Sequence, residues 1–175
     1  MRSALLLLIA VFIVYIPVVG LDFVSDDHAL ILHPVSGIEN QSLGSIFQSD
    51  LWHFQDSQSG YYRPLMMVSL WIDHKLWGTS ATGYHLHSLA WHLLSVGLLF
   101  GLLRNRFGES RALVASTLYA FHPAVSEVVC WISARNDSMA LSLGLVALIL
   151  SLREERRLRD AILAGVFTAL AGMTK

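Results

Sequence analysis

The chain has 175 residues, of which 54% are hydrophobic and only 14% are charged, and its mean hydropathy is +0.55. Soluble domains carry about 25% charged residues, so this composition is typical of an integral membrane protein. The formal net charge of −1 argues against nucleic acid as a partner, and the single cysteine excludes an internal disulfide and a multi-cysteine metal site.

The first apolar segment covers residues 3–21, contains no charged side chain and follows Arg2. A signal peptide has an apolar run of about 7–15 residues followed by a small-residue cleavage site, whereas this run is longer and lacks such a site. About 17–25 apolar residues suffice to span a bilayer. We therefore expect an uncleaved transmembrane helix over 3–21, kinked or ended near its outer end by Pro17.

The next segment, residues 22–83, is far too long for an ordinary connection between helices, and loops of this length usually carry function. It is also rich in aromatic residues, which favours a folded loop that packs at the membrane interface. Within it, the stretch "YYRPLMMVSLWIDHKLW" at 61–77 predicts an amphipathic helix with Pro64 in its first turn. The stripe expected to lie in the interface plane consists of Leu65, Val68, Trp71, Ile72, Lys75 and Leu76.

Four further apolar runs predict an all-α, multi-pass helical bundle. Their expected spans are residues 84–103, 111–126, 134–152 and 161–175. The loops at 104–111 and 153–160 are rich in arginine, whereas residues 22–83 hold seven Asp and Glu residues against Arg63 and Lys75. The positive-inside rule therefore places the N-terminus and both arginine-rich loops in the cytoplasm, and residues 22–83 and 122–138 outside.

The connection at residues 122–138 is informative because the apolar runs on either side are short. Ten residues of helix cover about 15 Å, half of the hydrocarbon core, so the run at 112–121 spans the membrane only by including part of this connection. Four ionisable residues then lie at the outer membrane boundary: His122, Glu127, Arg135 and Asp137. Ionisable groups at this depth usually face a cavity or one another, so we expect them to converge with Asp26 and Asp27.

Several motifs in this order resemble the N-terminal part of the multi-pass GT-C glycosyltransferases, in particular the transmembrane-and-tetratricopeptide-repeat O-mannosyltransferases and their bacterial relatives. The motifs are "DD" at 26–27, "YYRPL" at 61–65, "YH" then "LAWH" at 84–92, and "FHPAVSEVVCWISARND" at 121–137. Family members often have asparagine at the position of Ser88. They also continue with more helices and then repeats, so we expect the chain to be the N-terminal part of such a protein.

The resemblance implies transfer of a sugar, mannose in particular, from a polyprenyl-phosphate donor to a protein hydroxyl or another acceptor. The reaction would take place on the outer or lumenal face of a bacterial inner membrane or of the endoplasmic reticulum. One of Asp26 and Asp27 would be the general base. Adjacent side chains in extended backbone point opposite ways, so only one would face the cavity, and we favour Asp27.

The other implied roles concern the donor phosphate and the substrates. Arginine suits phosphate because its planar fork gives bidentate hydrogen bonds and a permanent charge. The predicted donor-phosphate and substrate-binding residues are Arg63, Arg135, His122, Glu127 and Asp137. The adjacent aspartates are also a possible site for Mg²⁺ or Mn²⁺, held together with waters and donor phosphate oxygens.

Each of these residues also has a structural interpretation. Aspartate favours turns and helix caps, so Asp26 and Asp27 can be turn residues, and Arg63 can pair with a carboxylate of the loop. Glu127, Arg135 and Asp137 can form an ion-pair network between two helices. His122 with Pro123 can shape a turn. His85 and His92 lie seven residues apart on one helix face, where packing is favoured over metal binding.

Two other function classes compete with the glycosyltransferase. A multi-pass transporter would place ion sites and broken helices near the membrane midplane, whereas the charged residues here gather at one face. A non-catalytic membrane scaffold, or a truncated remnant of an enzyme, is the remaining alternative.

Overall fold

The computed structural model describes residues 2–34, 37–51, 60–155 and 157–175, and within these ranges the chain is helical and contains no β-strand. The α-helices are α1 (Arg2–Tyr15), α2 (Leu43–Ile46), α3 (Pro64–Trp77), α4 (Ala81–Phe107), α5 (Glu109–Ala120), α6 (Pro123–Cys130), α7 (Arg135–Ser151) and α8 (Leu158–Gly172). Short turns of other helix types are η1 (Ile16–Gly20), η2 (His28–Leu32), η3 (Ile38–Asn40) and η5 (Ile132–Ala134). The predicted all-α class is confirmed.

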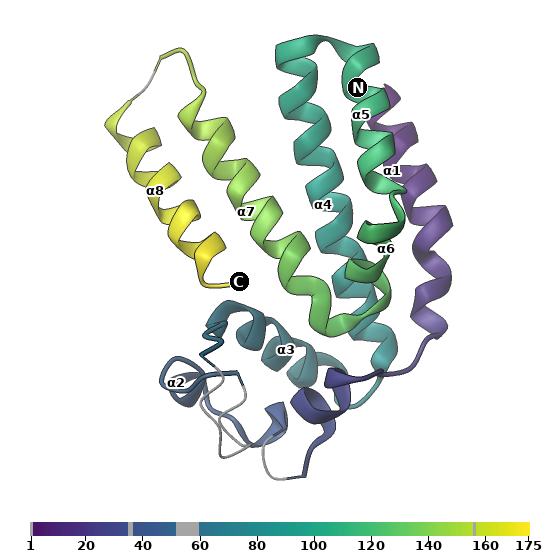
Figure 1. Ribbon diagram of the computed structural model, residues 1–175, viewed down its shortest axis with the longest axis vertical. Helices are drawn as coiled ribbons and strands as arrows, with labels where there is room; N and C mark the ends of the chain where they lie inside the picture. The colour runs from purple at the N-terminus through teal and green to yellow at the C-terminus, as the bar shows by residue number, and fades with distance from the viewer. Residues whose placement is uncertain (1, 35–36, 52–59, 156) are drawn as a thin grey trace.

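The long helices form a bundle in which α1, α5 and α6 pack on one side of α4, and α7 and then α8 follow on the other side (Figure 1). The core between α1, α4, α5 and α6 includes Val11, Val96, Phe100, Ala112 and Val129. The outer side of α1 instead exposes large apolar side chains, which is typical of a surface that faces lipid rather than water. They are Leu5, Leu6, Ile9, Phe12, Ile13 and Val14.

Two helical segments, Arg2–Gly20 and Ala81–Phe107, are long and apolar enough to cross a membrane. The first confirms the effect expected of Pro17, because the α-helix ends at Tyr15 and continues as the 3-10 turn η1. The second has 27 residues, about 40 Å of helix, and is longer than the predicted 84–103. It ends at Phe107, and the next residue, Gly108, has a φ of +86°, a conformation that favours glycine.

The predicted span at 111–126 is a broken helix in the structure. Helix α5 ends at Ala120 and α6 begins at Pro123, with an angle of 61° between them, and the pair together would make a third span. Pro123 lacks the N–H and clashes with the preceding turn, so it begins a helix but does not continue one. Helices α7 and α8 have 17 and 15 residues, and their role as spans stays a prediction.

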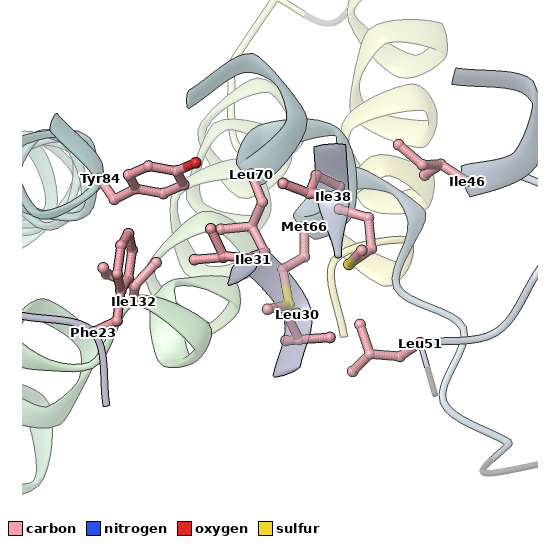
Figure 2. Close-up of a cluster of buried hydrophobic side chains, with 11 residues drawn as sticks. Phe23, Leu30, Ile31, Ile38, Ile46, Leu51, Met66, Leu70, Tyr84 and Ile132 are labelled. Carbon is pink, nitrogen blue, oxygen red and sulfur yellow. The ribbon is translucent and has the colours of Figure 1, made fainter. Parts of the chain in front are cut away.

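The first loop folds around α3, as Figure 2 shows. Its buried side chains come from η2, η3, α2 and α3 and include Phe23 and Leu51 outside these elements, and they pack against Tyr84 of α4 and Ile132 of η5. Helix α3 lies in the predicted stretch 61–77, and Pro64 is in its first turn as expected. Its buried residues are Pro64, Met66, Met67, Ser69, Leu70 and Asp73. The predicted interfacial stripe is therefore divided: Val68 and Trp71 are partly buried and pack against this core, whereas Ile72, Lys75 and Leu76 are exposed.

The two ends of the bundle are formed by different parts of the chain. The N-terminus, the α4–α5 turn and the α7–α8 connection lie at one end, and the first loop lies at the other end with the α6–α7 connection (Figure 1). This is the alternation that the charge pattern predicts. Which end faces the cytoplasm stays a prediction.

We expect cysteine labelling to show the first loop outside and the α7–α8 connection in the cytoplasm. Cys130→Ser removes the native thiol, and Glu39→Cys and Glu155→Cys then introduce single thiols at exposed positions. A membrane-impermeant maleimide should label Glu39→Cys in intact cells or sealed vesicles of right-side-out orientation, and Glu155→Cys only after permeabilisation. Equal labelling of both before permeabilisation would contradict this topology.

Candidate active site

A cavity of about 380 Å³ lies where the first loop meets the α6–α7 connection. Its charged lining residues come from five separate parts of the chain: Asp26, Arg63, Glu127, Asp137 and Lys175. Tyr61 and Trp131 add aromatic surface, and Asn136 adds an amide. The cavity therefore brings together Asp26 and three of the five predicted donor-phosphate and substrate residues, and it excludes His122 and Arg135.

The adjacent aspartates have different environments. Asp27 is fully buried, its Oδ1 accepts hydrogen bonds from the backbone N–H of Ser133 at 2.9 Å and from the Ser133 hydroxyl, and its Oδ2 accepts from the Val24 N–H at 3.2 Å. Asp26 is partly exposed and lines the cavity. Asp27 therefore joins the first loop to the segment that precedes α7, and Asp26 is the aspartate that a substrate can reach.

The backbone at this point corrects one expectation from the sequence. Asp27 has φ −58° and ψ −38°, which is helical backbone, not the extended backbone assumed for the pair. Successive side chains on a helix point about 100° apart. The two carboxylates therefore still diverge, but the direction of each depends on the turn that begins at Asp26.

Arg135 is fully buried, although the sequence suggested a place in the site. Its guanidinium donates to Asp73 Oδ2 at 2.5 Å, to the Ser69 and Ser88 hydroxyls at 2.7 and 3.0 Å, and to the Tyr84 carbonyl at 2.7 Å. These contacts join α7 to α3 and α4, and this geometry favours a structural role. The ion-pair alternative also needs correction, because the partner of Arg135 is Asp73 rather than Glu127 or Asp137.

The other oxygen of Asp73 extends this buried network to the surface of α4. His87 Nδ1 lies 2.6 Å from Asp73 Oδ1, and Trp91 Nε1–H donates to His87 Nε2 at 3.0 Å. The Nδ1–H tautomer of His87 satisfies both contacts. Ser88 of α4 belongs to the same network, because its hydroxyl accepts a hydrogen bond from Arg135.

Two cationic residues line the cavity. The Arg63 Nε–H donates to the Lys175 carbonyl at 2.8 Å, and its guanidinium lies 5.1 Å from the centroid of the Tyr61 ring. The Lys175 ammonium pairs with the Asp137 carboxylate. Sequence reasoning missed Lys175. The available signal was a single lysine directly after the apolar segment 161–174, at the outer end of the predicted fifth span.

The histidines singled out from the sequence have surroundings that are typical of capping or packing residues. His122 is exposed, and its Nδ1 accepts from the Ala124 N–H at 3.2 Å, so it caps α6. His92 is buried, its Nε2 lies 3.2 Å from the Ala120 carbonyl, and its ring packs edge-on against Tyr15. His85 is buried in the same helix, and neither of its ring nitrogens has a hydrogen-bond partner among the described residues.

A divalent cation shared by the adjacent aspartates does not fit this arrangement. Both oxygens of Asp27 already accept hydrogen bonds from Ser133 and Val24. Within the described ranges, no group of three or more His, Cys, Asp and Glu side chains is placed to hold a metal ion. The charged groups that this cavity offers are the carboxylates of Asp26, Glu127 and Asp137 and the cations of Arg63 and Lys175.

Comparisons of the chain with a family model and with individual proteins agree on one family. The family described as "Dolichyl-phosphate-mannose-protein mannosyltransferase" matches residues 63–175. A protein O-mannosyl-transferase of Caenorhabditis elegans is 31% identical over 160 residues, which is 87% of this chain and 23% of the relative. Protein O-mannosyl-transferase Tmtc1 of Drosophila melanogaster is 30% identical over 171 residues, 93% of this chain and 19% of the relative.

Protein O-mannosyl-transferase TMTC2 of Homo sapiens is 27% identical over 139 residues, which is 77% of this chain and 17% of the relative. The chain thus spans less than a quarter of the length of these relatives. No solved structure matches the chain.

Proposed function

Since the chain belongs to the dolichyl-phosphate-mannose-protein mannosyltransferase family, we propose that it provides part of the active site of a membrane glycosyltransferase. The proposed reaction moves mannose from a polyprenyl-phosphate donor to a hydroxyl group of a protein acceptor. The names of the relatives support the sugar and the protein acceptor, and the family description supports the lipid-phosphate donor.

The observation that carries the proposal is the grouping of Asp26 with Arg63 and Lys175 around one cavity. In the transfer, the acceptor oxygen forms a bond to the anomeric carbon of mannose, and the bond from that carbon to the phosphate oxygen breaks. The acceptor proton passes to Asp26, which acts as the general base. The electron pair leaves with the lipid phosphate, whose negative charge Arg63 and Lys175 stabilise.

Asp27 has a positioning role in this scheme. Its hydrogen bonds to Ser133 and Val24 fix the turn that carries Asp26 against the start of α7. Tyr61 and Trp131 provide aromatic walls against which the sugar can pack. Glu127 and Asp137 also line the cavity, where they are available to hydrogen-bond sugar or acceptor hydroxyls, and Asp137 holds the Lys175 ammonium.

The membrane setting is part of the proposal. A polyprenyl donor has its chain in the bilayer and its phosphate at the interface, and the cavity lies at the end of the bundle that carries the folded first loop (Figure 1). We place this end on the outer or lumenal face of a multi-pass protein with a cytoplasmic N-terminus. The membrane is the bacterial inner membrane or the endoplasmic reticulum.

The function is tested with the purified full-length protein, radiolabelled dolichyl-phosphate mannose and a protein acceptor. Transfer of label to the acceptor with equal release of dolichyl phosphate supports the proposal. A transporter or a scaffold would release no dolichyl phosphate. The same assay gives the KM for the donor, which separates donor binding from the chemical step.

Arg63→Lys should raise the donor KM about 10-fold or more, because lysine keeps the charge but loses the bidentate fork, and hydrogen bonds to charged groups contribute about 1.5–3 kcal/mol. Lys175→Gln should act in the same direction. The matched control is Lys75→Gln, which removes a cation of α3 that lies over Trp71 and outside the cavity. If Arg63→Lys and Lys175→Gln both leave the donor KM at the value of the control, these two cations do not bind the donor phosphate.

A further inference from the structure

A second cavity, of about 520 Å³, lies between α4 and α7. The two helices diverge toward the end of the bundle that holds the N-terminus, away from the candidate active site (Figure 1). The walls of this groove are apolar: Gly97, Leu98, Gly101, Leu102, Ile149 and Leu152. A Cβ atom added at Gly101 would meet no atom within 4 Å, so the helix backbone is open to the groove at this point.

The groove ends at a polar mouth that contains two arginines. Arg106 donates from Nη2 to the Leu152 carbonyl at 2.8 Å, which joins the end of α4 to the end of α7. Arg153 pairs with Asp160 at 2.8 Å and keeps 54% of its side chain exposed. A guanidinium carries five N–H donors, so these contacts leave donors on both side chains for an anion. Glu154 is the acidic residue of the same lining.

The mouth adjoins a third cavity of about 330 Å³, which shares Arg153 with the groove. Two further arginines, Arg157 and Arg159, line it together with Glu155 and Asp160. An apolar groove between two helices therefore leads to a pocket with an excess of arginine. The groove and the pocket are therefore complementary to a molecule with an apolar acyl chain and an anionic head group.

We propose that this groove binds an anionic glycerophospholipid. One acyl chain lies along Gly97 and Gly101 between α4 and α7, and the phosphate accepts hydrogen bonds from Arg106 and Arg153. Basic pockets between transmembrane helices on the cytoplasmic side bind anionic lipid head groups, and the charge pattern places this end of the bundle in the cytoplasm. The site is separate from the transfer chemistry, which takes place at the opposite end.

The proposal is tested by native mass spectrometry of the detergent-purified full-length protein with dioleoyl phosphatidylglycerol or dioleoyl phosphatidylcholine. These lipids share acyl chains and differ in head-group charge. The wild-type protein should bind one phosphatidylglycerol more tightly than phosphatidylcholine. The double variant Arg106→Gln with Arg153→Gln should lose about 10-fold or more of that affinity, because charge-assisted hydrogen bonds to the phosphate are removed.

A pair of glycine variants tests the groove without removing any contact. Gly101→Leu places a side chain in the groove and should abolish phosphatidylglycerol binding. Gly144→Leu is the control, because a Cβ there also meets no atom within 4 Å but Gly144 does not line the groove. This comparison is decisive even if the double arginine variant fails to fold.

Two results would overturn the proposal. The first is equal affinity of the wild-type protein for the two lipids, or phosphatidylglycerol binding by Gly101→Leu that matches Gly144→Leu. The second is a disulfide cross-link between Leu102→Cys and a cysteine placed in a helix of the full-length protein other than α1–α8, because such a helix would then fill the groove. Neither readout depends on mannose transfer, so failure here is distinguishable from failure of the proposed function.

Discussion

Asp26→Asn in the full-length protein should lower the rate of mannose transfer by about 10²–10⁴-fold, the usual range for loss of a general base. Asparagine nearly preserves the shape of the side chain but accepts no proton at this position. Asp26 lines the cavity and is partly exposed, so the thermal unfolding of the variant should match that of the wild-type protein. The donor KM should change little, because the cations that bind phosphate remain.

Asp27→Asn is the matched comparison, since it makes the same chemical change one residue away. Asp27 is fully buried and accepts hydrogen bonds from Ser133 and Val24. Its replacement should lower stability by about 1–3 kcal/mol, the cost of disturbing buried polar groups, and should reduce kcat less than Asp26→Asn does. A stable but inactive Asp27→Asn together with an active Asp26→Asn would reverse the two roles and restore the choice made from the sequence.

Asp73→Ala should destabilise the protein by about 3–5 kcal/mol, because removal of one partner leaves a buried charge uncompensated. Arg135 is fully buried and Asp73 is 1% exposed, so water cannot replace the lost interaction. The measurement is the thermal loss of monodisperse protein in detergent. Lys175→Gln, which breaks the more exposed pair with Asp137, is the control and should change stability by about 1 kcal/mol or less.

The same network decides between the two interpretations of Arg135. Lysine at this position has three donors instead of five and cannot reach Asp73, Ser69, Ser88 and the Tyr84 carbonyl together. Arg135→Lys should therefore lower stability while the folded protein keeps its donor KM. A stable Arg135→Lys variant with a raised donor KM would show instead that Arg135 binds the donor phosphate.

The membrane class and the positions of most helices could be predicted from the sequence. These features depend on local signals, namely apolar runs and the backbone preferences of proline. Thus Pro17 marks the end of the α-helical part of the first span, and Pro64 the first turn of α3. Pro123 is the exception. The sequence indicates only that Pro123 can shape a turn together with His122. The structure shows that it divides the predicted third span into α5 and α6.

The order of short motifs also indicated the family, which the match over residues 63–175 confirms. The composition of the first loop predicted that it would fold, because its many apolar and aromatic side chains need a core. That core exists, but the sequence could not show which residues of α3 it buries. The predicted stripe followed apolar residues at helical spacing, whereas burial also includes Asp73, whose charge is compensated by Arg135.

The division of the ionisable residues between cavity and core could not be predicted, because it depends on long-range packing. Asp73 and Arg135 are 62 residues apart and Asp27 and Ser133 are 106 apart, and no local pattern encodes such pairs. The contacts of Asp27 with Ser133 also bury this aspartate and leave Asp26 to line the cavity, which the sequence could not show. Lys175 lies in the site because the packing of α8 against α7 brings the segment after α8 beside Asp137.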